Sequence, residues 1–302
     1  MFIKKLTKQV ICNPEEPVVC TPNGKLRGLI VDGTYVFRGI KYCEARRFHL
    51  PEPAKSWEGV KEAIIYGPVC PEIQTVQPSD NYTVPHVFYP QDEDCQYLNI
   101  WTQSPDAGRK RPVLVWLHGG GFATGSGIEH FAYDGENMSR FGDVVVVTLN
   151  HRLNVLGFLD LSAYGEEYRY SANAGMADIV EALRWVQKNI EAFGGDPGNV
   201  TIFGQSGGGG KVAALLQMPS AAGLFHRAVI QSGIIRAHSG KAEGPDMARL
   251  LLDKLGITPE RIREIEEVPY YRFQQIISGL GPQAFMDFGP KRDDDLYMGS
   301  IF

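Results

Sequence analysis

The stretch "FGQSGGGGKV" (residues 203–212) decides which fold this sequence predicts. It places one serine, Ser206, among five glycines, and a lysine, Lys211, follows them. Three interpretations are open at the outset. The glycines could cradle a phosphate group, hold a catalytic serine on a tight turn, or form a flexible linker.

Both phosphate-binding patterns fail on inspection. A P-loop ending at Lys211 requires glycine where the chain has Gln205, and a hydroxyl residue where it has Val212. The dinucleotide-binding pattern fails because its last glycine falls on Val212 or Ala213. The glycine run therefore needs another explanation.

The pattern G-x-S-x-G does fit, at residues 204–208. An apolar strand-like run, "NVTIF" (199–203), precedes it, and a helical run, "KVAALLQM" (211–218), follows. This order is typical of a nucleophile elbow, in which a strained turn projects the serine hydroxyl from the sheet edge. Glycine costs up to about 1 kcal/mol per residue in a helix, so the run indicates close approach of backbone to substrate. A bare Gly-Ser loop is the alternative.

A second glycine cluster supports the elbow. "HGGGF" (118–122) ends the apolar run "PVLVWL" (112–117), well upstream of Ser206. Acyl transfer needs N–H donors aimed at the oxyanion, and a glycine loop of this kind supplies them in serine hydrolases. Alone the cluster would be a simple turn, but both motifs in this order predict an acyl-transfer site.

The rest of the chain predicts βαβ units. "DVVVVTLNHRL" (143–153) and "RAVIQSG" (227–233) contain further buried strands, and residues 174–195 have helical spacing. We therefore expect an α/β fold with a mostly parallel central sheet flanked by helices. Residues 17–42 predict an N-terminal antiparallel meander and residues 51–92 a long ordered loop. Amphipathic helices follow in residues 244–279, and a single domain spans residues 1–302.

The composition narrows the function classes. The 302 residues are 43% hydrophobic and carry a net charge of −5, with no basic cluster, which argues against nucleic-acid binding. Neither a signal peptide nor an 18-residue apolar stretch is found, so we expect no membrane span and a cytoplasmic location. The five cysteines include no C-x-x-C pair, and no metal or cofactor fingerprint is present.

With these motifs in place, the chain resembles the type-B carboxylesterases, the cholinesterase-like branch of the α/β-hydrolases. The resemblance is close to the bacterial para-nitrobenzyl esterase type. "FGGDPGNVTIFGQSGGG" (193–209) matches the family's serine signature, and "EDCQYLNIW" (93–101) resembles its second signature. The resemblance runs from "GKLRG" (24–28) to Phe288.

The resemblance implies a carboxylic ester hydrolase acting on small-molecule esters without a cofactor. Ser206 would be the nucleophile, and the backbone N–H groups of Gly120, Gly121 and Gly207 would form the oxyanion hole. His118 would be a structural loop residue. Gln205 stands in the substrate pocket where many members carry Glu, so we expect no strong preference for cationic, choline-like esters.

The resemblance also implies three structural pairings. One is a disulfide bond that closes a loop and contributes about 3.5 kcal/mol, although in a reducing compartment its cysteines would stay free. This disulfide bond would join Cys70 to Cys95. The other two pairings are ion pairs, Arg47 with Glu93 and Arg152 with Asp178, for which the alternative is unpaired surface charge.

One departure from the family pattern is large. The family's catalytic acid and base follow the serine far downstream, and we expect neither before Phe302. His226 and His238 are the only histidines after Ser206, and neither lies in a family base motif. The acid and base would then come from a missing C-terminal segment or from a second chain. The alternatives are an inactive cholinesterase-like binding protein and a truncated gene product that does not fold stably.

Overall fold

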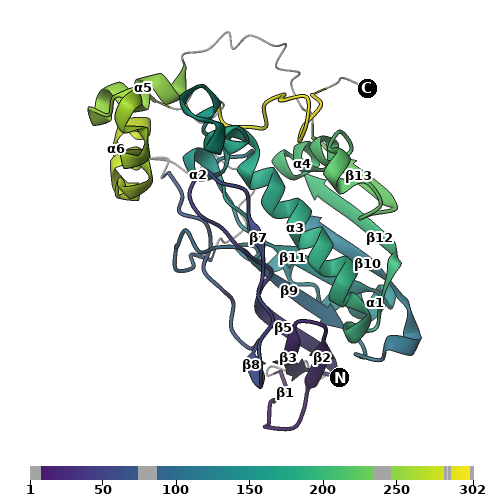
Figure 1. Ribbon diagram of the computed structural model, residues 1–302. Helices are drawn as coiled ribbons and strands as arrows, with labels where there is room; N and C mark the ends of the chain where they lie inside the picture. Colours follow the sequence, from purple (N-terminus) through teal and green to yellow (C-terminus); the bar gives the residue numbers. More distant parts are fainter. Residues whose placement is uncertain (1–7, 74–86, 234–245, 282–283, 285–286, 300–302) are drawn as a thin grey trace, which may run out of the picture.

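The computed structural model describes residues 8–73, 87–233, 246–281, 284 and 287–299. Its main feature is an eight-stranded sheet in the order β1-β4-β5-β9-β11-β10-β12-β13 (Figure 1). Two small sheets, β2-β3-β8 and β6-β7, complete the strands. The strands are β1 Val10–Ile11, β2 Val18–Thr21, β3 Gly24–Arg27, β4 Leu29–Val31, β5 Thr34–Lys41, β6 Cys43–Glu44, β7 Glu52–Pro53, β8 Val60–Glu62, β9 Tyr97–Thr102, β10 Arg111–Leu117, β11 Val145–Leu149, β12 Gly195–Gln205 and β13 Arg227–Gln231.

The described residues also form six α-helices and several 3₁₀ helices. In Figure 1, α3 lies across the sheet, and α5 and α6 stand beside it. The helical spacing predicted for residues 174–195 is confirmed, with the last turn tightening to a 3₁₀ helix. The helices are α1 Glu136–Gly142, α2 Asn154–Phe158, α3 Ala174–Asn189, α4 Gly207–Leu215, α5 Met247–Leu255 and α6 Tyr270–Gly279, with the 3₁₀ helices η4 Glu166–Tyr168 and η8 Pro259–Glu267 among the turns.

The parallel part of the sheet brings the two glycine motifs together. β10 pairs in parallel with both β11 and β12, and β12 pairs in parallel with β13. Leu117, the last residue of β10, lies opposite Gly204, near the end of β12. Since parallel strands end at the same edge of a sheet, the residues that follow β10 and β12 are neighbours.

The sheet is buried on both faces, as the continuously apolar runs predicted. Along β11, Val145 and Val147 belong to the large core that also contains the buried side chains of α3. Val146 points the other way and joins Trp101 in a smaller core. Gly135, just before α1, packs directly on Trp101, so α1 covers this second face.

The predicted N-terminal antiparallel meander forms, but its strands are divided between two sheets. The antiparallel pairs β2-β3 and β4-β5 form, but β3 joins the small sheet with β8 and β5 joins the large sheet with β9. The chain changes sheet at Gly28. A Cβ atom there would lie 2.5 Å from the carbonyl oxygen of Val36, so only glycine allows this close passage.

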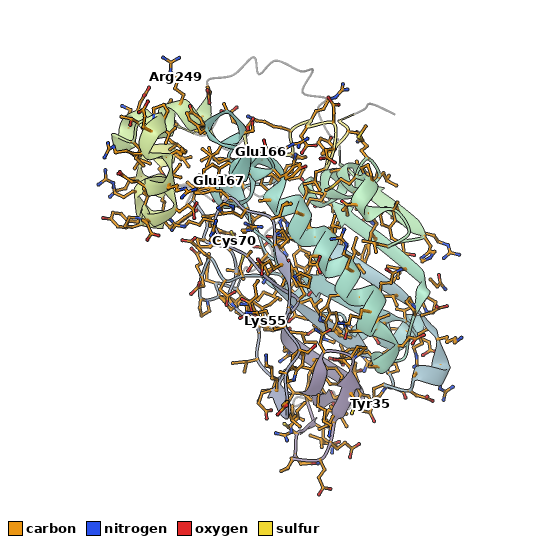
Figure 2. All side chains as sticks on the ribbon, in the orientation of Figure 1. Tyr35, Lys55, Cys70, Glu166, Glu167 and Arg249 are labelled. Atoms are coloured by element: carbon orange, nitrogen blue, oxygen red, sulfur yellow. The ribbon has the colours of Figure 1, made fainter. Side chains whose placement is uncertain are left out.

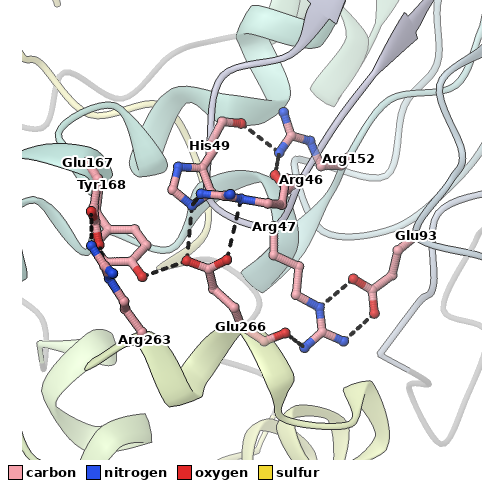
Figure 3. A network of polar contacts seen from close by, with 9 residues as sticks. All are labelled: Arg46, Arg47, His49, Glu93, Arg152, Glu167, Tyr168, Arg263 and Glu266. Carbon is pink, nitrogen blue, oxygen red and sulfur yellow. Dashed lines mark hydrogen bonds and ion pairs between the residues drawn. The ribbon is translucent and has the colours of Figure 1, made fainter. Parts of the chain in front are cut away.

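A polar network attaches the C-terminal helices to the body of the protein (Figure 3). The predicted ion pair between Arg47 and Glu93 is confirmed, and Arg47 Nη1 also donates to the carbonyl oxygen of Glu266 at 2.9 Å. The Glu266 carboxylate accepts from Tyr168 Oη at 2.7 Å and contacts His49 Nε2 at 3.0 Å. Glu266 of η8 is thus joined to Arg47 and His49, more than two hundred positions earlier, and to Tyr168, 98 positions earlier. Figure 2 shows Arg249 on α5 and Tyr35 at opposite ends of the molecule.

The second predicted ion pair, between Arg152 and Asp178, is also confirmed, and it is buried. Their side chains are 3% and 0% exposed, and Nη2 of Arg152 lies 2.6 Å from Oδ1 of Asp178. The Arg152 side chain donates further to the carbonyl oxygens of Arg46 and His49, each at 2.8 Å. This pair therefore joins α3 to the loop after β11 and to the loop after β6.

The outer edge of the sheet is apolar. Among the described strands, β13 pairs with β12 only, and its Val229 and Ile230 are 45% and 42% exposed. An unpaired edge of this kind readily accepts a further strand. Within the described ranges, no helix has the length and apolar character needed to span a membrane.

Candidate active site

The turn at Ser206 has the geometry that the G-x-S-x-G motif predicted. Ser206 lies between the end of β12 and the start of α4, with φ 57° and ψ −122°. Few non-glycine residues adopt a positive φ, and such strain is typical of functional turns. Its N–H donates to the carbonyl oxygen of Gln231 at 2.8 Å, and its own carbonyl oxygen accepts from Gly210 at 3.0 Å. The turn is held from both sides while Ser206 itself is exposed.

The glycine loop after β10 lies directly against this turn. Gly120 and Gly121 have φ values of 83° and 63°, which favour glycine. A Cβ atom on Gly207 would lie 2.4 Å from the backbone nitrogen of Gly121. One on Gly119 would lie 3.7 Å from the Cβ atom of Ser206. The structure therefore brings together the serine and the glycine backbone that the sequence placed about 85 residues apart.

Residues from two other segments hold the glycine loop in place. Glu72 Oε1 accepts from the N–H of Gly125 at 2.6 Å. The side chain of Asn154 donates to the carbonyl oxygen of Ala123 at 3.2 Å, and its backbone N–H donates to that of Phe122 at 2.8 Å. The loop thus has fixed partners along its length, as a preorganised site requires.

Lys211 was predicted only as a helix residue, and its burial was missed. Its side chain is fully buried, and Nζ donates to the carbonyl oxygen of His118 at 2.9 Å. Burial lowers the pKa of Lys211 to about 7. The signal available in the sequence was a single charged residue next to the apolar run "VAALL" (212–216).

Two histidines lie beside this lysine. The rings of His118 and His151 stack at 5.3 Å, and burial together with the charge of Lys211 lowers the pKa of each well below its usual value. Nδ1 of His118 donates to the carbonyl oxygen of Gly119 at 2.9 Å. Both histidines are therefore neutral, buried side chains under the glycine loop, and His118 is placed as the structural residue we expected.

We predict that Lys211 makes stability depend on pH. The unfolded lysine, with a pKa of 10.5, holds its proton between pH 7 and 10.5, whereas the folded one has lost it. The unfolded state then binds more protons, so stability rises with pH, by at most about 1.4 kcal/mol per unit. Urea unfolding at pH 7 and pH 9 measures this rise. It should be smaller in Lys211→Met, and equal rises in both proteins would contradict the assignment.

The disulfide bond expected between Cys70 and Cys95 is not formed in the structure. Both are free, buried thiols, and burial followed by the neighbouring Cys70 raises the pKa of Cys95 well above its usual value. The two thiols remain in contact with each other, and each sulfur has a further polar contact. Sγ of Cys70 accepts from the N–H of Leu153 at 3.2 Å, and Sγ of Cys95 lies 3.6 Å from Nε2 of Gln96.

The remaining predicted residues lie as follows. Gln205 is exposed beside Ser206. Nδ1 of His226 accepts from the N–H of Val200 at 3.2 Å, at the start of β13. Because Ser206 contacts the other end of this strand, at Gln231, the five residues of β13 separate them by about 16 Å. His226 is thus outside the site, and His238 lies outside the described residues.

A hollow of about 530 Å³ lies elsewhere, and none of its lining residues belongs to the turn or the glycine loop. Its lining is charged: Arg46, Glu167, Arg263, Glu264, Glu266 and Glu267. No cluster of three or more His, Cys, Asp or Glu in the described part of the chain could hold a metal ion.

The large sheet is mixed rather than mostly parallel, because β11, β10, β12 and β13 pair in parallel whereas β1, β4, β5 and β9 pair antiparallel. A parallel half-sheet with a strained serine turn after one strand, and a glycine loop after its neighbour, defines an α/β-hydrolase. The solved structures agree. An esterase from Clostridium hathewayi, described as able to hydrolyse aliphatic aromatic polyesters, has a TM-score of 0.87 and 53% identity, covering 97% of this chain and 59% of that one. Carboxylesterase EST55 of Geobacillus stearothermophilus has a TM-score of 0.78 and 42% identity, covering 92% of this chain and 56% of that one.

Sequence comparisons identify the family. The model of the carboxylesterase family matches residues 15–293. Para-nitrobenzyl esterase of Bacillus subtilis (strain 168) is 43% identical over 83% of this chain and 50% of its own length. Phenmedipham hydrolase of Pseudarthrobacter oxydans is 46% identical over 72% of this chain and 43% of its own length. The chain belongs to the carboxylesterase family, and it spans about half the length of the curated relatives it matches.

Proposed function

We propose that this chain carries the nucleophile and oxyanion half of a carboxylic ester hydrolase. Ser206 attacks the carbonyl carbon of a small-molecule ester, and the N–H groups of Gly120, Gly121 and Gly207 stabilise the oxyanion. The alcohol leaves, and water then releases the acid from the acyl-enzyme. The observation that carries the proposal is the contact between the backbones of Gly207 and Gly121 beside a strained, exposed Ser206.

The general acid and base are proposed to come from outside these residues. Each of the five described histidines has other surroundings. His118 and His151 are buried under the glycine loop, and His226 lies at the far end of β13. His49 contacts Glu266, and the ring of His130 packs on Tyr133. A serine without a base is a weak nucleophile near neutral pH. We propose that a C-terminal segment, or a second chain carrying it, supplies both groups.

The edge of the sheet favours this arrangement. In the part of the chain that the structure describes, β13 has no strand partner on its outer side and exposes Val229 and Ile230, so a complementing segment can add a strand there. Residues 1–302 would then form a single, incomplete domain, and Gln205 would line the completed substrate pocket. The cytoplasmic location predicted from the sequence stays a prediction.

A fluorophosphonate probe tests the proposal, because it labels serines that are both activated and supported by an oxyanion hole. The chain is mixed with the C-terminal part of the Clostridium hathewayi esterase that lies beyond the matched region. We expect labelling at Ser206 in the mixture, little labelling of the chain alone, and none in Ser206→Ala. Hydrolysis of a chromogenic para-nitrophenyl ester should follow the labelling.

Two outcomes would count against the proposal. Strong labelling of the chain alone would place a base within these residues and refute the missing-base part. A folded complex that neither labels nor hydrolyses would refute catalysis. The alternative of a non-catalytic binding protein rests on no observation of this structure, since the serine turn and its glycine loop are both formed.

A further inference from the structure

Lys211 contacts the glycine loop from behind. It lies on α4, five residues after Ser206, and its side chain is fully buried. Nζ donates to the carbonyl oxygen of His118, the residue that joins the end of β10 to Gly119. One side chain thus links the helix that begins after the serine to the strand that ends before the glycines.

This lysine occupies a position where an apolar residue would be the simpler choice. Burial lowers the pKa of Lys211. Glu129 and Cys70 raise this pKa, but by less than burial lowers it. His118 and His151, which also face it, are kept neutral. Burying an ammonium group costs free energy that burying an apolar side chain of similar size does not. Packing alone therefore gives no reason for lysine here.

The contact with His118 gives a reason. An amine donates a hydrogen bond in its charged and in its neutral form, so the link to the carbonyl oxygen persists across the pH range. It reinforces a second contact one turn earlier, where Gly208 packs against the carbonyl oxygens of Leu117 and His118. Together these contacts fix the spacing between the end of β10 and the first turns of α4.

We infer that Lys211 is a positioning residue, which clamps His118 to α4 and so keeps the N–H groups of Gly120 and Gly121 aligned with that of Gly207 around Ser206. It touches neither substrate nor the reacting atoms. The inference rests on the proposed function, because alignment matters only if these N–H groups stabilise an oxyanion.

The clamp is tested first without any assay of activity. Hydrogen exchange is followed in the 302-residue chain for the wild type, Lys211→Met and Lys211→Gln. Loss of one buried hydrogen bond corresponds to about a tenfold change in an opening equilibrium. We expect amides of residues 119–125 to exchange at least about tenfold faster in Lys211→Met, with β11 unchanged. Lys211→Gln retains a donor and should lie nearer the wild type. Lys188→Met, at an exposed position of α3, is the matched control.

Turnover is tested in the complemented protein of the previous subsection. We expect Lys211→Met to lower kcat at least about tenfold with KM within about twofold, because oxyanion stabilisation acts on the transition state. Its thermal midpoint should stay equal to the wild type or rise. Lys211→Gln should recover part of kcat.

The outcomes separate the inference from the proposed function. If the amides of Lys211→Met exchange as in the wild type and its kcat equals that of the wild type, the inference is overturned. A lower thermal midpoint with faster exchange throughout the chain would also overturn it, because this would mean a merely structural role. If the complemented wild type is inactive, the proposed function fails, and exchange at residues 119–125 still decides whether the clamp exists.

Discussion

Asp178→Ala is expected to lower the free energy of unfolding by about 3–5 kcal/mol. The Asp178 carboxylate accepts from the backbone N–H of Arg152 at 3.0 Å, from Nε at 2.9 Å and from Nη2 at 2.6 Å. Removing it leaves a guanidinium group in the interior without its counter-charge. Because a domain is typically stable by only about 5–15 kcal/mol, this loss is a large share of the total.

Guanidinium chloride unfolding, followed by circular dichroism, measures the effect. Glu167→Ala is the matched control, since its partner Arg263 is 79% exposed and solvent screens that pair. The control should unfold like the wild type. Replacing both partners, as Arg152→Met with Asp178→Leu, should recover part of the loss, although the carbonyl oxygens of Arg46 and His49 lose their donor. A loss below about 1 kcal/mol in Asp178→Ala would contradict the assignment.

Gly208→Ala is expected to damage both the fold and the serine turn. A Cβ atom at this position would lie 2.0 Å from the carbonyl oxygen of Leu117, so the first turn of α4 must move away from β10. Forced overpacking costs about 1–3 kcal/mol, and backbone cannot yield as a flexible side chain does. We expect a loss near the upper end and, in the complemented protein, no labelling of Ser206 by the fluorophosphonate probe.

Gly279→Ala is the matched control for this substitution. Gly279 ends α6, and no atom lies within 4 Å of its Cβ position. Alanine should leave stability unchanged or raise it by up to about 1 kcal/mol, because it restricts the unfolded chain. Unfolding of Gly208→Ala at the wild-type midpoint, with normal labelling, would show that the turn tolerates displacement and would weaken its proposed role.

Most of the architecture could be predicted from local patterns. The buried runs at 112–117, 143–153 and 199–203 became β10, β11 and β12, because continuous apolar segments bounded by glycine are typical of parallel strands. The spacing in residues 174–195 specified α3. The division of the meander between two sheets could not be predicted, because the sheet that a strand joins depends on distant partners, here β8 and β9.

The candidate site was predicted in part. The motif at residues 204–208 and the glycines at 119–121 could be read from the chain, since a strained turn needs particular residues at particular spacings. The Arg47 and Arg152 ion pairs followed from the family resemblance. The free thiols of Cys70 and Cys95 did not, because whether two neighbouring cysteines are oxidised depends on the redox compartment.

By itself, the sequence determined the strained turn at Ser206, the glycine loop and the order of strands and helices around them. These depend on backbone conformations that few residues other than glycine adopt, and on apolar periodicity, both of which are local. Only the tertiary structure decided that Lys211 reaches the carbonyl oxygen of His118, 93 residues away, and that β13 presents an open apolar edge. Such features depend on which segments pack together, because burial and hydrogen bonding join residues that no local pattern connects.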